Sequence, residues 1–209
     1  MQPPSFLEVS DSRQAAMRAM FMARKDVFID LLGWDLPVLE GKYELDQFDG
    51  PDAEYIILSD PNGAHRASAR LLPTDRDHLL SACFPMLCGE ALPSGPTIRE
   101  ITRFCLDRRQ RAPERKSARN QLVTALVEHA LMHGITDYTG VAETAWFEQI
   151  MTFGWNCRPL GSPKRVGDHR LIGLHITIDV DTLPALQRNG VFERSRFRIS
   201  EERYGKGNA

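Results

Sequence analysis

The segment 115–133 restricts the fold of this chain more than any other feature of its sequence. Its apolar residues lie nearly all round a helix and comprise Leu122, Val123, Ala125, Leu126, Val127, Ala130 and Leu131. A helix with apolar side chains in every direction must be covered by other elements. Gly134 follows as a C-terminal cap. We therefore expect a long buried helix around which the remaining elements pack.

Several strands surround this helix in the sequence. Residues 54–60 and 65–72 flank the turn signal Pro61-Asn62-Gly63, which predicts an antiparallel hairpin. Residues 97–107 alternate well enough to form another strand. Further elements are predicted as helical segments in 12–32, a strand near 136–142, a helix near 143–153, and strands near 155–160 and 171–179. This order predicts an α/β fold in which helices cover a mixed, mainly antiparallel sheet.

The length of 209 residues suits a single domain, 1–209, and the charged residues from about 195 predict a loose C-terminal tail. The N-terminal residues do not resemble a signal peptide, and no apolar run approaches about 18 residues. We therefore expect a cytoplasmic protein without a membrane span. A net charge of −2 argues against nucleic acid as a partner.

No metal site is expected. The spacing of the four cysteines matches no zinc or redox motif, and the histidines form no HExxH motif. The chain also lacks the Gly-x-Ser-x-Gly motif of a nucleophile elbow.

Charge is distributed unevenly along the chain. Residues 35–60 hold eight acidic residues and one basic residue, whereas residues 99–119 hold eight basic and three acidic residues. The acidic region suits a cationic small molecule, and the basic region suits phosphates or an acidic protein. Charge alone favours a plainer interpretation, in which both regions are solvated surfaces.

Aromatic and charged residues gather in the first quarter of the chain: Arg24, Phe28, Trp34, Glu44, Asp46, Phe48 and Asp49. Arg24 and Phe28 are four residues apart and share a helix face. Paired carboxylates beside aromatic rings suit a ligand that carries positive charge. By themselves, these residues favour a surface arginine, two core aromatic residues and a solvated acidic loop.

The same residues resemble the opening signature of the acyl-homoserine-lactone synthases, the autoinducer synthases of bacterial quorum sensing. Three later segments resemble further landmarks of that family in the same order: residues 69–73 (ARLLP), 84–85 (FP) and 100–104 (EITRF). The resemblance covers about residues 20–107 and continues more weakly to about 160. It implies the fold of the GCN5-related N-acyltransferases.

The resemblance also implies a reaction. The amine of S-adenosylmethionine attacks the acyl thioester of an acyl carrier protein or acyl-CoA. The methionine carboxylate then closes the lactone and expels methylthioadenosine. Both ligands are substrates, so no cofactor is expected.

Site roles follow from this reaction. Glu100 is the candidate base for the amine. Asp46 and Asp49 balance the positive charge of S-adenosylmethionine, and Trp34 or Phe28 covers it. The candidates for binding its carboxylate are Arg24, Arg70 and Arg103, each of which can instead pair with an acidic neighbour.

A regular strand places Glu100 and Arg103 on opposite faces because they are three residues apart. If both reach one pocket, a β-bulge must separate them. We therefore predict an irregularity in this strand; without one, Arg103 is structural.

The donor end is predicted from two further groups of residues. The basic candidates for binding phosphate or a carrier protein are Arg108, Arg109, Arg111, Arg115 and Lys116. The candidates for lining the acyl pocket are Phe84, Phe104, Val141, Trp146, Phe147 and Met151. Acetyl-CoA enzymes of this fold have a glycine-rich turn here, but no glycine occurs between residues 96 and 133.

Two other functions remain open. One is an N-acetyltransferase that uses acetyl-CoA, which the missing glycine-rich turn disfavours. The other is a non-catalytic sensor of acyl ligands, which would be expected to have lost some of the charged residues named above.

Overall fold

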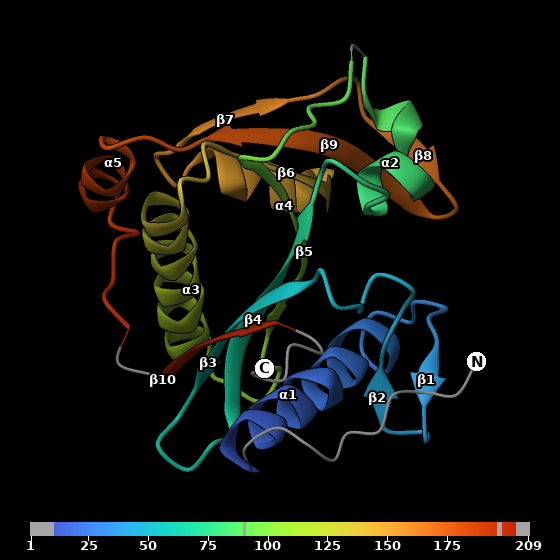
Figure 1. Cartoon of the computed structure of the whole chain (residues 1–209), viewed down its shortest axis with the longest axis vertical. Helices are drawn as coiled ribbons and strands as arrows, with labels where there is room; N and C mark the ends of the chain where they lie inside the picture. The colour runs from blue at the N-terminus through green and yellow to red at the C-terminus, as the bar shows by residue number, and fades with distance from the viewer. Residues whose placement is uncertain (1–10, 90, 196–197, 204–209) are drawn as a thin grey trace.

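The structure, a computed structural model, describes residues 11–89, 91–195 and 198–203. Its main sheet has the strand order β10-β3-β4-β5-β6-β9-β7, and β8 also pairs with β9 (Figure 1). The strands are β3 (Glu54–Ser59), β4 (His65–Pro73), β5 (Ile98–Leu106), β6 (Asp137–Glu143), β7 (Asn156–Pro159), β8 (Lys164–Val166), β9 (His169–Thr177) and β10 (Arg198–Arg203). Among the described strands, β5 and β6 are the one pair that runs in parallel. The predicted mixed, mainly antiparallel sheet is confirmed.

Helices cover both faces of this sheet. The helical elements are α1 (Asp11–Arg24), the π-helical turn η1 (Lys25–Ile29), α2 (Leu79–Cys83), the 3₁₀ turn η2 (Pro85–Leu87), α3 (Ala112–His133), α4 (Thr144–Met151) and α5 (Thr182–Arg188). A small separate sheet pairs β1 (Val38–Leu39) with β2 (Tyr43–Glu44). No helix in the described part of the chain combines the length and apolar character needed to cross a bilayer.

The alternation of β3 explains how two helices share one sheet. Ile56 and Leu58 join the core cluster of α3, whereas Tyr55 and Ile57 pack in the cluster that contains Phe21 of α1. Successive strand residues point to opposite faces, so an apolar run can be buried on both sides. The predicted buried helix is confirmed as α3, which carries eleven buried residues.

Some elements of the structure were not predicted from the sequence. The helical elements α2 and η2 lie between β4 and β5, where no element was predicted, and α5 follows β9, where no helix was predicted. The predicted loose tail is wrong for residues 198–203, which form β10 on the edge of the sheet beside β3. An edge strand can join a sheet through backbone hydrogen bonds alone, so the charged sequence of β10 did not indicate that it forms a strand.

The strands β5 and β6 separate halfway along their length. Their parallel ladder joins 98–101 to 137–140 and then stops, while both strands keep their outer partners β4 and β9. At Gly140 an added Cβ would lie 3.0 Å from the Ile101 carbonyl oxygen, so glycine permits the close approach at this fork.

The predicted irregularity in β5 is present. Ser68 pairs with Cys105 and Arg70 pairs with Thr102, so Arg103 and Phe104 together oppose the single residue Ala69. Arg103 has a φ of 50°, which is unusual for a residue with a side chain. A bulge of this kind bends the strand and redirects a side chain, here that of Arg103, just where the fork opens.

Candidate active site

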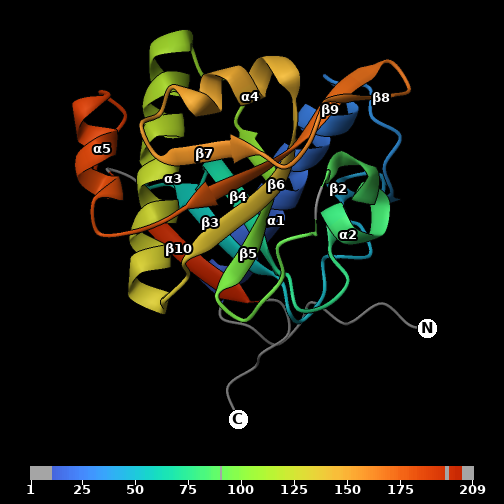
Figure 2. The ribbon, with the colours of Figure 1, turned by 90° about the horizontal axis from the view of Figure 1, so that it is seen from above.

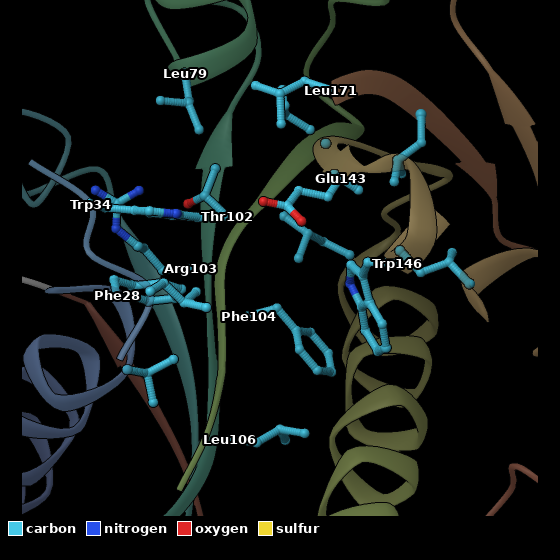
Figure 3. Close-up of a pocket in the computed structure, with 18 of the residues that line it drawn as sticks. Phe28, Trp34, Leu79, Thr102, Arg103, Phe104, Leu106, Glu143, Trp146 and Leu171 are labelled. Carbon is cyan, nitrogen blue, oxygen red and sulfur yellow. The ribbon is translucent and has the colours of Figure 1, made fainter. Parts of the chain in front are cut away.

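A cleft of about 1090 Å³ opens where β5 and β6 diverge. Figure 3 shows Phe28, Trp34 and Arg103 along one wall and Glu143 and Trp146 along the other, with Phe104 and Leu106 deeper between them. The first wall comes from the N-terminal segment and the bulge of β5. The second comes from β6 and α4, so residues more than a hundred positions apart meet across the cleft.

The inner part of the cleft is apolar and aromatic. The Phe104 ring lies 5.7 Å from Trp146, and Trp146 lies 5.9 Å from Phe153, measured between ring centroids. Leu106, Val123 and Leu126 also line this region. Such a surface suits a hydrocarbon chain, because it offers contact area without a requirement for hydrogen bonds.

Four of the six residues predicted for the acyl pocket line the cleft: Phe84, Phe104, Val141 and Trp146. Phe147 instead packs against the main core, and Met151 is 45% exposed. The cleft face of α4 carries Trp146, Gln149 and Ile150, at spacings of three and four. Phe147 and Met151 are four apart on a different face of the helix, so neither lines the cleft.

Three arginines and three carboxylates form a charge network behind the first wall. Arg24 donates through Nε to Glu44 at 2.5 Å, and its two terminal nitrogens donate to the two oxygens of Asp49 at 2.8 Å each. Asp49 also accepts from the Tyr55 hydroxyl at 2.7 Å. Arg24 and Glu44 are fully buried, and neither lines the cleft.

Asp46 links the other two arginines of the network. Arg70 donates to Asp46 Oδ1 at 2.6 Å and through Nε to Thr102 Oγ1 at 2.9 Å. Arg103 donates to Asp46 Oδ2 at 2.6 Å and to Glu44 Oε1 at 3.0 Å. Of the six charged residues, Asp46 and Arg103 line the cleft, whereas Asp49 and Arg70 stay behind it.

The network is electroneutral, since its three positive charges match its three carboxylates. Burial by itself would raise the pKa of Asp49, but the guanidinium groups of Arg24 and Arg70 hold that pKa well below its usual value. Burial likewise opposes the charge of Arg24, and the carboxylates of Asp49 and Glu44 more than compensate, which raises its pKa. All three carboxylates are therefore occupied by arginines, which leaves no place among them for a metal ion.

Local hydrogen bonds and ring contacts position the residues of the first wall, which we call the polar wall. The Asp46 carboxylate accepts from the Phe48 backbone N–H at 2.9 Å, and Asp49 accepts from the Asp46 N–H at 2.8 Å. These bonds fold the acidic loop onto itself, as aspartates commonly do in turns. The π-helical turn η1 holds Phe28, whose ring stacks on Trp34 at 5.0 Å, and the Arg103 guanidinium lies 5.6 Å from the Phe28 ring centroid.

Glu100 is placed beside the cleft but beneath α2. It is fully buried and accepts a hydrogen bond from the Leu80 N–H at 2.9 Å, while its Oε2 makes no hydrogen bond. Burial raises the pKa of Glu100 to about 8, against the opposing effect of backbone N–H groups of α2. Leu79 of α2 lines the cleft and Glu100 does not. The predicted base is therefore enclosed in this conformation.

Sequence reasoning missed a carboxylate that does face the cleft. Glu143 ends β6 and its carboxylate points into the cleft (Figure 3). His169 Nδ1 lies 2.6 Å from Glu143 Oε1, and the His169 ring meets the Trp34 ring at 6.4 Å. Nothing in the local sequence marks Glu143, because β6 and β9 bring it to His169 only in the folded sheet.

The basic residues divide into two groups. Arg115 and Lys116 line the cleft, and so does Arg119, which the sequence analysis did not single out. Arg115 and Arg119 are four residues apart on α3, a spacing that could have identified the second from the first. Three predicted residues lie outside the cleft: Arg108, Arg109 and Arg111. Arg108 donates to the Asp26 carbonyl at 3.2 Å, and Arg109 pairs with Asp107 at 3.0 Å.

Comparisons with known proteins agree on one family. The family model described as autoinducer synthase matches residues 8–186. An acyl-homoserine-lactone synthase of Ralstonia nicotianae is 31% identical over 180 residues, which is 83% of this chain and 87% of that protein.

Solved structures give the same result. The CoA-dependent acyl-homoserine lactone synthase BjaI, solved with SAM and isopentyl-CoA, is 26% identical with a TM-score of 0.76, and the match covers 86% of each chain. A putative N-acetyltransferase from Lactobacillus plantarum, 19% identical with a TM-score of 0.52, shares the fold over 79% of this chain and 92% of its own.

Proposed function

This chain belongs to the autoinducer synthase family, and from that premise we propose that it synthesises an acyl-homoserine lactone. In this proposal S-adenosylmethionine is the acyl acceptor, and an acyl carrier protein or acyl-CoA is the donor. The observation that carries it is the fork between β5 and β6. On one side of this fork lies the polar wall, which suits a charged amino acid. The inner part of the cleft, called the apolar chamber below, suits an acyl chain.

The acceptor lies against the polar wall. Trp34 and Phe28 cover the sulfonium, whose charge is attracted to aromatic faces and to the cleft-facing carboxylate of Asp46. The methionine carboxylate pairs with Arg103, the cleft-facing arginine of the network. Arg24, Asp49 and Arg70 hold these two residues from behind. The network is neutral, whereas the sulfonium and ammonium of S-adenosylmethionine outweigh its single carboxylate. The aromatic faces of Trp34 and Phe28 and the Asp46 carboxylate therefore have to stabilise the remaining positive charge.

The donor enters through the fork. Beyond Ile101 the facing edges of β5 and β6 no longer pair with each other, so they can bond to the amides of a pantetheine arm. The acyl chain then extends toward Phe104 and Trp146. Arg115, Lys116 and Arg119 place positive charge on the α3 side of the cleft, suited to a phosphate or to an acidic carrier protein.

The first chemical step requires a base. The ammonium gives up a proton and the amine attacks the thioester carbonyl, which expels a thiolate that takes up a proton. We propose that Glu100 accepts the amine proton once α2 moves aside. Enclosed beneath α2, it has a pKa of about 8, which is close enough to neutral pH for some of the free enzyme to hold the ionised form that accepts a proton. Glu143 is the second candidate, since it faces the cleft without any such movement.

In the second step the methionine carboxylate attacks its own γ-carbon and closes the lactone. The C–S bond breaks toward sulfur, which leaves as neutral methylthioadenosine. Carboxylate and sulfonium charges cancel, so a dry and neutral environment favours this step. Neither step is a redox reaction, and the proposal therefore includes no cofactor. We also propose a cytoplasmic location, where both substrates occur.

The test uses purified protein with S-adenosylmethionine and a panel of acyl carrier proteins and acyl-CoA thioesters, analysed by mass spectrometry. We expect an acyl-homoserine lactone and methylthioadenosine in equal amounts. The preferred thioester identifies the donor. Asp46→Asn should lose this activity, whereas Asp60→Asn, in the exposed hairpin turn, should retain it. An acetylated amine would instead indicate an N-acetyltransferase, and tight binding without turnover would indicate a sensor.

A further inference from the structure

Two histidines and two carboxylates meet where α3 passes the edge of the sheet. His129 and His133 stand one turn apart on α3, and their ring centroids are 4.3 Å apart. Glu201 of β10 and Glu54 of β3 point toward them. Figure 2 shows β10 beside the C-terminal end of α3. None of the four residues lines the cleft. The expectation of no metal overlooked this i, i+4 histidine pair.

His129 is the buried member of the group. Its side chain is 4% exposed, yet neither ring nitrogen makes a hydrogen bond. The nearest carboxylate oxygens lie 3.4 Å from Nε2, on Glu54, and 3.3 Å from Nδ1, on Glu201. Both nitrogens thus face carboxylates at ion-pair distance without forming a hydrogen bond, and an ion bound between Nδ1 and the Glu201 carboxylate would satisfy that side of the buried ring.

The spacing of the ligand atoms fits a metal ion. His133 Nε2 lies 3.4 Å from Glu201 Oε2, and His129 Nδ1 lies 3.3 Å from Glu201 Oε1. Zinc bonds of about 2.0–2.2 Å place two tetrahedral ligands roughly 3.3–3.5 Å apart. One ligand atom from each of the three residues falls within 4.8 Å of the others. Small side-chain adjustments are therefore enough to enclose an ion.

Glu54 lies where a supporting carboxylate is needed. It approaches Nε2 of His129, the nitrogen that points away from Glu201. A proton on Nε2 directed at Glu54 leaves the Nδ1 lone pair free for a metal. Histidine ligands commonly donate their second N–H to a carboxylate in this way, which fixes the tautomer and the ring orientation.

From this geometry we propose a metal site, in which His129 Nδ1, His133 Nε2 and the Glu201 carboxylate bind a divalent transition metal of the zinc class. Imidazole and carboxylate ligands suit such ions. His133 and Glu201 are each 43% exposed, so water can complete the coordination. The ion ties β10 to α3 and thereby fastens the C-terminal strand against β3, which would otherwise be the exposed edge of the sheet.

The test needs no catalytic readout and therefore stands apart from the proposed function. Full-length protein without a histidine tag is stripped with a chelator and titrated with Zn²⁺ by calorimetry. Co²⁺ serves as the spectroscopic probe. We expect one equivalent to bind, an increase in Tm with Zn²⁺, and visible Co²⁺ bands of a four-coordinate N/O site.

Variants identify the ligands. His133→Ala and Glu201→Gln, both at half-exposed positions, should each weaken Zn²⁺ binding by at least about 100-fold and abolish the Co²⁺ bands. Glu54→Gln should weaken binding by roughly 10-fold, the effect typical of a supporting carboxylate. Glu128→Gln, the matched charge change on α3 outside the group, should bind as the original chain does.

Two results would overturn the proposal. One is the absence of stoichiometric Zn²⁺ binding. The other is binding that persists unchanged in His133→Ala and Glu201→Gln, since the ion would then be held elsewhere on the surface. If these variants lower the Tm of the metal-free protein and Zn²⁺ has no effect, the group is an ion pair and the metal site is wrong.

Discussion

The two walls of the cleft differ in the interactions that hold their side chains in place. On the polar wall, Arg24, Arg70 and Arg103 each bond to more than one partner, and the charges balance within the wall. The apolar part of the second wall is centred on Trp146, which packs against Phe104, and these side chains are held by packing and not by hydrogen bonds to each other. In a network of buried ion pairs, replacing one side chain leaves the charges of its partners unpaired. Packed apolar side chains can instead be exchanged for others of similar volume.

This difference separates two tasks that one active site must combine. The acceptor is the same molecule in every turnover, so the wall that receives it can be rigid. Acyl donors differ in length, and a packed wall can be altered one side chain at a time. Changes in the polar wall should therefore abolish folding or activity, and changes in the apolar wall should alter selectivity.

The largest effect is expected for Arg70→Met. It removes the fully buried guanidinium that pairs with both Asp46 and Asp49. Breaking a buried ion pair on one side costs about 3–5 kcal/mol, so the free energy of unfolding should fall by that amount. Chemical denaturation followed by circular dichroism measures it.

Arg66→Met on the same strand is the matched control. Arg66 pairs with Asp60 at the surface, and its side chain is 32% exposed. Its loss should cost less than about 1 kcal/mol. Equal stability of the Arg70 and Arg66 variants would mean that the polar wall is not the rigid part of the site.

The second effect concerns the proton acceptor. Glu100→Gln should lower kcat by a factor on the order of 10²–10⁴ while the protein stays folded. In the original chain kcat/KM should rise with pH up to about 8, because the base must lose its own proton before it can accept one. Comparing pH–rate profiles of Glu100→Gln and Glu143→Gln distinguishes the two candidates, since only the true base abolishes this dependence.

Glu100 should also make stability depend on pH. Burial raises its pKa from 4.5 to about 8, so the folded state binds the proton more tightly than the unfolded state does. The resulting stability is fully present below pH 4.5 and is lost as pH rises through about 8. Denaturation midpoints of Glu100→Gln should therefore decline less over this range than those of the original chain. Parallel curves would contradict the buried placement of Glu100.

A smaller, selective effect is expected on the apolar wall. Trp146→Ala enlarges the chamber and should shift preference toward longer acyl chains, with kcat/KM ratios changing by about tenfold or more. Met151→Ala on the same helix is the control, because Met151 is exposed and does not line the cleft. Competition between acyl donors of different length, read by mass spectrometry, gives the ratio directly.

The smallest effect is expected at the basic rim. Lys116→Ala should raise KM for the acyl donor several-fold and reduce its dependence on salt, with kcat nearly unchanged. Arg188→Ala removes one positive charge at the end of α5, outside the cleft, and should leave KM unchanged. If KM for the acyl donor depends on salt equally in both variants, Lys116 does not take part in donor binding.

Much of the fold could be predicted because its elements carry their own periodicity. The all-round apolar pattern of α3 and the turn between β3 and β4 required no long-range information. The short helices α2 and α5 lack such a pattern, and β10 is stabilised by its pairing with β3. Local propensity is weak in segments this short, so tertiary contacts decide them.

The candidate site divides in the same way. Arg24, Asp46 and Arg103 could be proposed from sequence because charged residues at those spacings resemble a family signature. Sequence alone could not show that Asp46 and Arg103 face the cleft while Arg24 lies behind them, since this depends on how α1, the acidic loop and β5 pack together. Glu143 was missed because its neighbours in the cleft are distant in sequence, whereas Arg119 could have been identified from Arg115, four residues earlier on the same helix.

The sequence by itself determined the chemistry available to this protein: an acidic, aromatic first half, a basic segment ahead of a buried helix, and a strand in which Glu100 and Arg103 could reach one pocket only if a bulge separated them. The tertiary structure decided which of these groups face the cleft, which stay buried, and how His129, His133 and Glu201 come together. The physical reason is that side-chain identity and local periodicity are properties of short segments. Burial and the pairing of charges depend on contacts between strands and helices that lie far apart along the chain.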